Sequence, residues 1–221
     1  MAEPVKLEQL ASSEGQTFRQ LYAIYAASIA AREQKRESWL AAMVDAPEYR
    51  VWVAKAGGVV QGFSILFVPA AGGFALLEYM AVAPDQRSHG LGAELFRQTV
   101  KAAVTPEERP LPVLLEVDSD REACDDRALR TRRERFYRRL GCLRLAGLRY
   151  VMPLGGVGAP PEMDLLIYAA EPLGSLVRSG VARGEVKRWL ETIYRDVYHC
   201  SPDDPRLAQM LAGLPDPVLL D

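Results

Sequence analysis

The chain has 221 residues, 49% of them hydrophobic and 25% charged, which is enough apolar material for one large domain or one domain with an added piece. Its formal net charge of −2 argues against a general basic field for nucleic acid, and no apolar run approaches the ~20 residues that span a bilayer. Three widely spaced cysteines argue against a disulfide framework or a zinc site, and the N-terminal residues lack the layout of a secretion signal. These features predict a cytoplasmic protein without a metal, a membrane or a nucleic-acid partner.

Apolar periodicity predicts helices and then strands in the first half of the chain. Phe18, Tyr22, Tyr25 and Ile29 are spaced as one face of a helix. The pattern then changes to strands, with a hairpin turn signal at Gly57–Gly58. The helices predicted here are 16–31, 33–44 and 90–104, and the strands are 49–55, 59–68 and 74–82.

The second half continues the alternation and ends in helices. The predicted elements are strands at 112–118, 142–153 (irregular at Gly147) and 162–170, and a helix at 127–140. This order predicts a mixed α/β fold with a central sheet over residues 1–171, followed by a C-terminal helical extension over 172–221. The extension carries an apolar stripe of Val186, Leu190, Ile193 and Val197. It must bury this stripe against its own domain or against a second copy of the chain, as in a homodimer.

Two glycines, Gly90 and Gly92, stand between a predicted strand end and a predicted helix start. The first N–H groups of a helix have no partner inside the helix, and the helix dipole adds partial positive charge there. Glycines let a phosphate approach those amides, and Arg87 supplies a positive charge nearby. The residues alone leave a second interpretation open, in which Gly90 is only a turn residue. Neither a Walker loop nor a dinucleotide fingerprint fits the spacing.

The segment Arg87-Ser-His-Gly-Leu-Gly-Ala93 resembles the first signature of the GNAT superfamily of N-acyltransferases. It follows Val82-Ala-Pro84, which is similar to the family's lead-in, and ERFYRRLGC over 134–142 resembles the second signature. Cys142 departs from that signature, which usually has an aromatic residue there. The resemblance covers roughly the first 170 residues, leaves the extension unexplained, and implies a GNAT-type mixed central sheet flanked by helices.

The resemblance also implies acetyl-CoA as the acyl donor. Its pyrophosphate would lie on the backbone amides of residues 87–93, and its pantetheine arm would run beside the strand that ends at Val82. The implied cofactor-binding residues are Met80, Val82, Arg87, Ser88, His89, Gly90, Leu91, Gly92 and Ala93.

Three residues are candidates for the chemistry of acyl transfer, and two for substrate contact. Tyr137 stands where the family usually places its general acid, although it could equally pack in a core helix. Glu78 and Glu116 each lie in an otherwise apolar strand, where a carboxylate is costly unless it is solvated or paired. One would accept a proton and the other bind an ammonium group, unless they face solvent at a sheet edge. Tyr25 and Glu33 lie where substrates of this family usually enter.

The leading hypothesis is an acetyl-CoA-dependent N-acetyltransferase that acts on a small-molecule amine. One rival is a protein lysine or N-terminal acetyltransferase, and another is a non-catalytic module that binds acyl-CoA. Seven arginines over 127–139 are offset by acidic neighbours, which predicts a solvated helix face rather than a nucleic-acid site.

Overall fold

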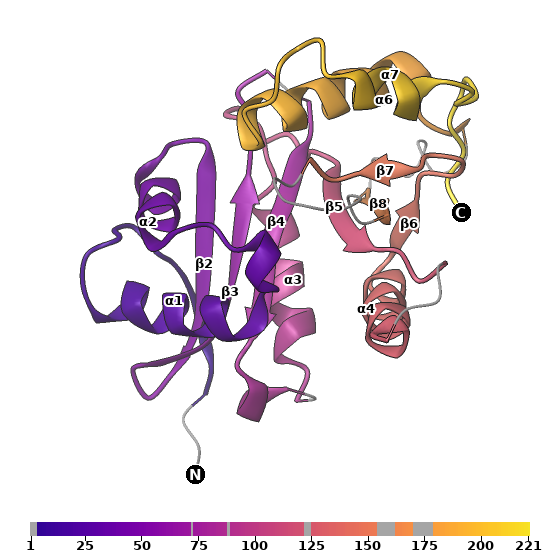
Figure 1. The fold of residues 1–221 in the computed structure, drawn as a ribbon. Helices are drawn as coiled ribbons and strands as arrows, with labels where there is room; N and C mark the ends of the chain where they lie inside the picture. The colour runs from indigo at the N-terminus through magenta and orange to yellow at the C-terminus, as the bar shows by residue number, and fades with distance from the viewer. Residues whose placement is uncertain (1–3, 72, 88, 122–124, 154–161, 170–178) are drawn as a thin grey trace. The chain divides into compact units, whose positions relative to one another are not determined.

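A computed structural model describes residues 4–71, 73–87, 89–121, 125–153, 162–169 and 179–221 (Figure 1). Residue contacts divide the chain into two compact units. The first comprises Met1–Ala70 and Ala75–Arg109, and the second Ala71–Phe74 and Pro110–Asp221. Every helix among the described residues is too short or too polar to cross a membrane.

The first unit is an antiparallel sheet in the order β1-β2-β3-β4, with three α-helices. Its strands are β1 (Lys6–Gln9), β2 (Tyr49–Ala56), β3 (Val59–Phe67) and β4 (Ala75–Val82). Its helices are α1 (Gln16–Ser28), α2 (Glu37–Asp45) and α3 (Leu91–Lys101), with short 3₁₀ turns η1 (Ala31–Glu33) and η2 (Pro84–Gln86).

The helices of this unit cover both faces of its sheet. Side chains alternate between faces along a strand, so Ser64 points away from its neighbours Phe63 and Ile65. Phe63 and Ile65 belong to the core that buries α1 and α2. The hydroxyl of Ser64 instead hydrogen-bonds that of Thr99 in α3, at 2.5 Å. Helices α1 and α2 therefore lie on one face and α3 on the other.

The second unit has β8 at the centre of its strands. Strands β5 (Val113–Asp118) and β6 (Cys142–Arg144) pair antiparallel with β8 (Glu162–Tyr168), and the short β7 (Tyr150–Val151) pairs with β8 beyond β6. Its helices are α4 (Arg127–Arg139), α6 (Arg183–Thr192), the π-helical turn η3 (Ile193–Val197) and α7 (Pro205–Leu211). In Figure 1, α6 and α7 lie together, and α7 also contacts β7.

The described C-terminal residues pack against the strands of this second unit. The four residues of the predicted apolar stripe are at most 2% exposed. Trp189 packs its ring on Phe74, with ring centroids 6.2 Å apart. Beyond α7 the chain returns to form bridges between Val218 and Val181 and between Leu220 and Leu145.

Three element bounds differ from prediction for identifiable reasons. The second helix begins at Glu37 rather than at residue 33, because the chain first makes η1. The side-chain amide of Gln34 also donates to two carbonyls at the end of the preceding helix. The strand predicted over 142–153 is two strands, β6 and β7, because Gly147 takes a left-handed backbone with φ 78°. Strand β1 was not predicted, because four mostly exposed residues carry little alternation.

Candidate functional site

The glycine loop of the first unit has the backbone of an anion-binding helix start. Gly90 is the N-cap of α3, with left-handed φ 83° and ψ −11°. The amides of Ala93 and Glu94 donate to the Gly90 carbonyl, so the preceding Leu91 and Gly92 amides come before the first bond within the helix. A Cβ at Gly90 would meet nothing within 4 Å, which leaves the approach to this backbone open.

The side chains around this loop hold it to the end of β4. Arg87 is exposed, and its Nε donates to the carbonyl of Val82 at 3.2 Å. His89 is exposed beside Gly90, and Met80 and Val82 are half-buried in β4. Ser88, also predicted to bind the cofactor, lies outside the described residues.

Glu78 lies at an irregularity in β4. The pairing of β3 with β4 passes from Ile65–Tyr79 to Leu66–Leu77, so Glu78 has no opposite residue and forms a β-bulge. Bulges redirect side chains and are frequent beside active sites. The carboxylate is only 3% exposed; it accepts a hydrogen bond from the Tyr49 hydroxyl at 2.8 Å and pairs with Lys35 Nζ at 3.1 Å. The costly carboxylate is thus buried with a cation and a hydroxyl rather than facing water.

The two residues predicted to contact the substrate, Tyr25 and Glu33, differ in their exposure to solvent. Tyr25 is fully buried, and its ring meets that of Tyr79 edge-on at 5.0 Å. Its hydroxyl accepts from the Lys35 amide at 2.6 Å, and burial raises its pKa. Glu33 is half-buried; its carboxylate pairs with Arg32 and its carbonyl accepts from the Tyr79 hydroxyl. Tyr25 therefore positions the chain at Lys35, and its contact with substrate stays a prediction.

In the second unit, Glu116 of β5 is bound by two tyrosines. The Tyr150 hydroxyl of β7 donates to Oε1, and the Tyr198 hydroxyl donates to Oε2 at 2.6 Å. Burial, and next the charge of Glu116, raise the pKa of Tyr150 well above its ordinary value. Hydrogen bonds donated to a carboxylate favour its ionised form. Glu116 is thus held at both carboxylate oxygens, rather than being a sheet-edge residue in open solvent.

Tyr137 is buried in α4, with Phe136 edge-on at a centroid distance of 5.1 Å. Burial raises its pKa to about 12, against a smaller opposing effect of Arg133. The phenol is therefore protonated at neutral pH and able to donate a proton. Cys142, in β6, is buried and its thiol pKa is raised to about 12 by burial, as expected for an unreactive packing residue.

The predicted residues thus fall into two groups. The first unit holds Glu78 and the described residues of the glycine loop, and the second holds Glu116 and Tyr137. Sequence reasoning missed the partners of the two glutamates: Lys35, Tyr49, Tyr150 and Tyr198. No pattern in the sequence pairs residues as far apart as 116 and 198.

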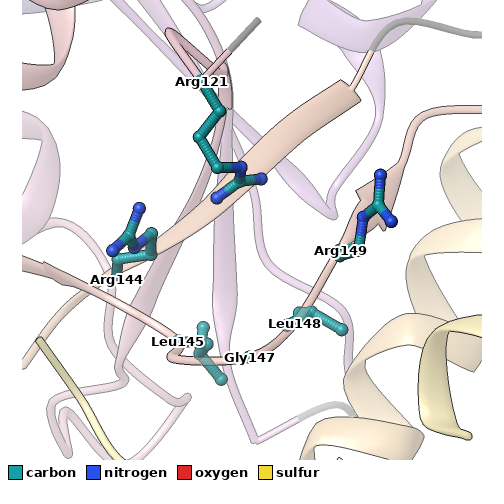
Figure 2. Close-up of a pocket in the computed structure, with 6 residues that line it drawn as sticks. All are labelled: Arg121, Arg144, Leu145, Gly147, Leu148 and Arg149. Atoms are coloured by element: carbon teal, nitrogen blue, oxygen red, sulfur yellow. The ribbon is translucent and has the colours of Figure 1, made fainter.

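A hollow of about 510 Å³ lies in the second unit beside the turn between β6 and β7 (Figure 2). Leu145, Gly147 and Leu148 line it from that turn, together with Arg121, Arg144 and Arg149. Arg121 pairs with Asp164 at 2.5 Å, and Arg144 with Asp221 at 2.9 Å. Its lining includes none of the predicted site residues, and these two arginines already serve ion pairs within the fold.

Comparison with known proteins bears on both the family and the fold. Residues 47–141 match the family model of the acetyltransferase (GNAT) domain. No curated protein matches the sequence. A solved structure from Bacteroides thetaiotaomicron, assigned to the GNAT family of acetyltransferases, is similar with a TM-score of 0.66 and 18% identity, covering 89% of this chain and 99% of that chain.

Two further solved structures share the fold. The ribosomal-protein-S18-alanine N-acetyltransferase of Escherichia coli has a TM-score of 0.52 and 20% identity, covering 77% of this chain and 99% of that one. Ard1 of Thermoplasma volcanium has a TM-score of 0.55 and 16% identity, covering 74% and 96%. These likenesses confirm the predicted fold class, a mixed sheet flanked by helices.

Proposed function

We propose that the chain is a GNAT-family acetyltransferase that transfers the acetyl group of acetyl-CoA to the amine of a small molecule, because residues 47–141 match the model of the acetyltransferase (GNAT) domain. The observation that carries the proposal is the start of α3. A left-handed Gly90, open space where a Cβ would stand, and amides that precede the first helical bond together suit a diphosphate.

The residues present fit acetyl-CoA as the acyl donor. The amides of residues 90–92 and the exposed Arg87 would hold its pyrophosphate, and the backbone of Met80 and Val82 would bind its pantetheine arm. When bound, it supplies a thioester carbonyl for attack and a thiolate as the leaving group. The side chains of the protein would then donate and accept the protons that the reaction requires.

Tyr137 is the proposed general acid. As the N–C bond forms and the C–S bond breaks, the sulfur needs a proton, and the neutral Tyr137 phenol donates it. The attacking nitrogen releases one proton to solvent in the same turnover. Solvent then returns one proton to the Tyr137 phenolate, so the phenol is restored and no net proton is gained or lost by the tyrosine. A phenol whose pKa is about 12 stays protonated between turnovers at neutral pH.

Glu78 is the proposed proton acceptor for the ammonium group of the substrate, through water. Its bulge position redirects the side chain, and the Tyr49 hydroxyl orients it. Lys35 Nζ lies 3.1 Å from the carboxylate and compensates its burial. Glu116, a second carboxylate held at both oxygens, is proposed to bind the cation.

A protein acceptor is the second candidate function. The likeness of fold to the ribosomal-protein-S18-alanine N-acetyltransferase supports it, since the name of that protein gives an alanine of a ribosomal protein as the acceptor. The two carboxylates favour a small cationic amine, such as a polyamine, an amino sugar or an amino-acid derivative. Each carboxylate could pair with an ammonium group of such an acceptor.

The test combines calorimetry with a turnover assay. Calorimetry should show acetyl-CoA binding to the full chain, and thiol release should show turnover with one or more of spermidine, glucosamine and lysine methyl ester. Turnover only with N-terminal peptides would establish the protein acceptor instead. Binding without turnover over both panels would establish the non-catalytic acyl-CoA module, and absence of binding would overturn the anion-site assignment.

A further inference from the structure

The C-terminal segment reaches the carboxylate that is proposed to bind the substrate cation. Glu116 lies in β5, and each of its carboxylate oxygens accepts a hydrogen bond from a tyrosine. Tyr150 belongs to β7, but Tyr198 belongs to the C-terminal extension, 82 residues further along the chain. The extension therefore contributes a side chain to this carboxylate as well as packing area.

Local backbone geometry explains how Tyr198 reaches Glu116. Residues 193–197 form a π-helical turn, and the Tyr198 amide donates to the Ile193 carbonyl at 3.3 Å. A π turn adds one residue to a helical turn and is frequent at functional sites. It shifts the side chains that follow relative to the buried stripe of α6. Tyr198 is consequently half-buried and directed at the carboxylate, although the stripe itself is in the core.

Tyr194 fixes this turn in place by a separate contact. Its hydroxyl donates to the carbonyl of Val151 in β7, and its ring meets that of Tyr198 edge-on with centroids 6.5 Å apart. Tyr194 is 1% exposed and the guanidinium of Arg206 lies 5.6 Å from its ring centroid. Two tyrosines of one turn thus have different tasks: Tyr194 holds the turn on β7, and Tyr198 extends to Glu116.

A carboxylate held at both oxygens is fixed in orientation. Each phenol fixes one oxygen, so the plane of the carboxylate cannot rotate without breaking a hydrogen bond. Hydrogen bonds to a charged group are among the stronger ones in proteins. Loss of one phenol would release one oxygen and weaken the hold on any cation that depends on this orientation.

We propose that Tyr198 is a positioning residue for Glu116, and that the C-terminal extension thereby helps determine which cationic amines the enzyme accepts. The inference rests on the proposed function, because it assigns Glu116 to the acceptor side of that reaction. It gives the extension, which lies outside the residues that match the GNAT domain model, a part in substrate selection.

The experiment uses the full chain and the best acceptor among spermidine, glucosamine and lysine methyl ester. Tyr198→Phe removes one hydroxyl and keeps the ring. It should raise the KM of the acceptor about tenfold, with kcat and acetyl-CoA affinity little changed. Tyr194→Phe is the matched control: the same change, four residues earlier in the same segment, should lower the melting temperature and leave the acceptor KM within about twofold.

A double-mutant cycle separates positioning from general damage. In a Glu116→Gln background, adding Tyr198→Phe should change the acceptor KM by no more than about twofold, because the charge that Tyr198 orients is gone. An unchanged KM in Tyr198→Phe, or an equal rise in Tyr194→Phe, overturns the inference while the enzyme assignment stands. A wild-type chain that acetylates none of the three amines overturns the proposed function, and this inference with it.

Discussion

Tyr137 and Glu78, the proposed acid and the proposed base, are both buried, but in different surroundings. The first is buried in α4, where the charged phenolate would be desolvated. The Glu78 side chain is buried too, but the Lys35 ammonium and the Tyr49 hydroxyl compensate the cost of its burial. A phenol in an apolar site and a carboxylate beside a cation suit the two proton transfers proposed for them.

Tyr137→Phe tests the acid. The ring and its contact with Phe136 remain, so the variant should fold, but the thiolate loses its proton donor. We expect kcat to fall by about 10- to 10⁴-fold with acetyl-CoA affinity unchanged, as measured by steady-state kinetics and calorimetry. A wild-type kcat would make Tyr137 a packing residue.

The raised pKa of Tyr137 gives a second expectation for the same residue. Its folded pKa of about 12 exceeds the ordinary value of 10.0, so the folded chain holds this proton more tightly than the unfolded chain does. The resulting stabilisation is complete below about pH 10 and is lost as the pH rises toward about 12. Urea titrations at alkaline pH should show Tyr137→Phe less sensitive to pH in this window than the wild type.

Glu78→Gln tests the base. Turnover should fall about tenfold or more, most strongly at low pH, where the amine is protonated and must lose a proton. Some loss of stability should accompany it, because Lys35 keeps its charge without the carboxylate. Lys35→Met in the same background should restore stability but not turnover. If Glu116→Gln shows this pH dependence and Glu78→Gln does not, the two roles are exchanged.

At the scale of elements, the sequence located the glycine loop, the strands and the helices well, because periodicity and glycine placement are local signals. It identified Glu78 and Glu116 only as carboxylates in apolar strands. The bulge that redirects Glu78 depends on how β3 pairs with β4, and the phenols on Glu116 come from distant segments. Neither is written in a short stretch of residues, so their partners could not be predicted.

The loop before α3 gives the prediction at this scale. Gly92 is the second residue of the helix, so Gly92→Ala should fold normally and weaken acetyl-CoA binding only in part. Gly92→Asp adds a carboxylate where phosphates are proposed to bind and should abolish detectable binding by calorimetry. A negative charge is tolerated at the start of a helix, so the melting temperature of the Gly92→Asp variant should stay close to that of the wild type. Equal affinity in wild type and Gly92→Asp would place the diphosphate elsewhere.

At the scale of the whole molecule, the extension predicted over 172–221 bears on the stability of the second unit. Its described residues bury Trp189, Leu190 and Ile193, and Asp221 pairs with Arg144. Deleting 172–221 should lower the melting temperature and the selectivity among amines while acetyl-CoA binding remains, with a monomer in sedimentation. A dimeric full chain whose truncated form is a stable, fully active monomer would make the extension an assembly device.

The short segment Ala71–Phe74 constrains any attempt to take the molecule apart. It belongs to the second unit, where Phe74 packs on Trp189, yet the residues on both sides of it belong to the first. The chain therefore crosses between the units more than once. A single cleavage of the chain cannot yield two fragments that each contain one complete unit. Strand β4 starts directly after Phe74, so one peptide bond joins the last residue of this segment to a strand of the first unit.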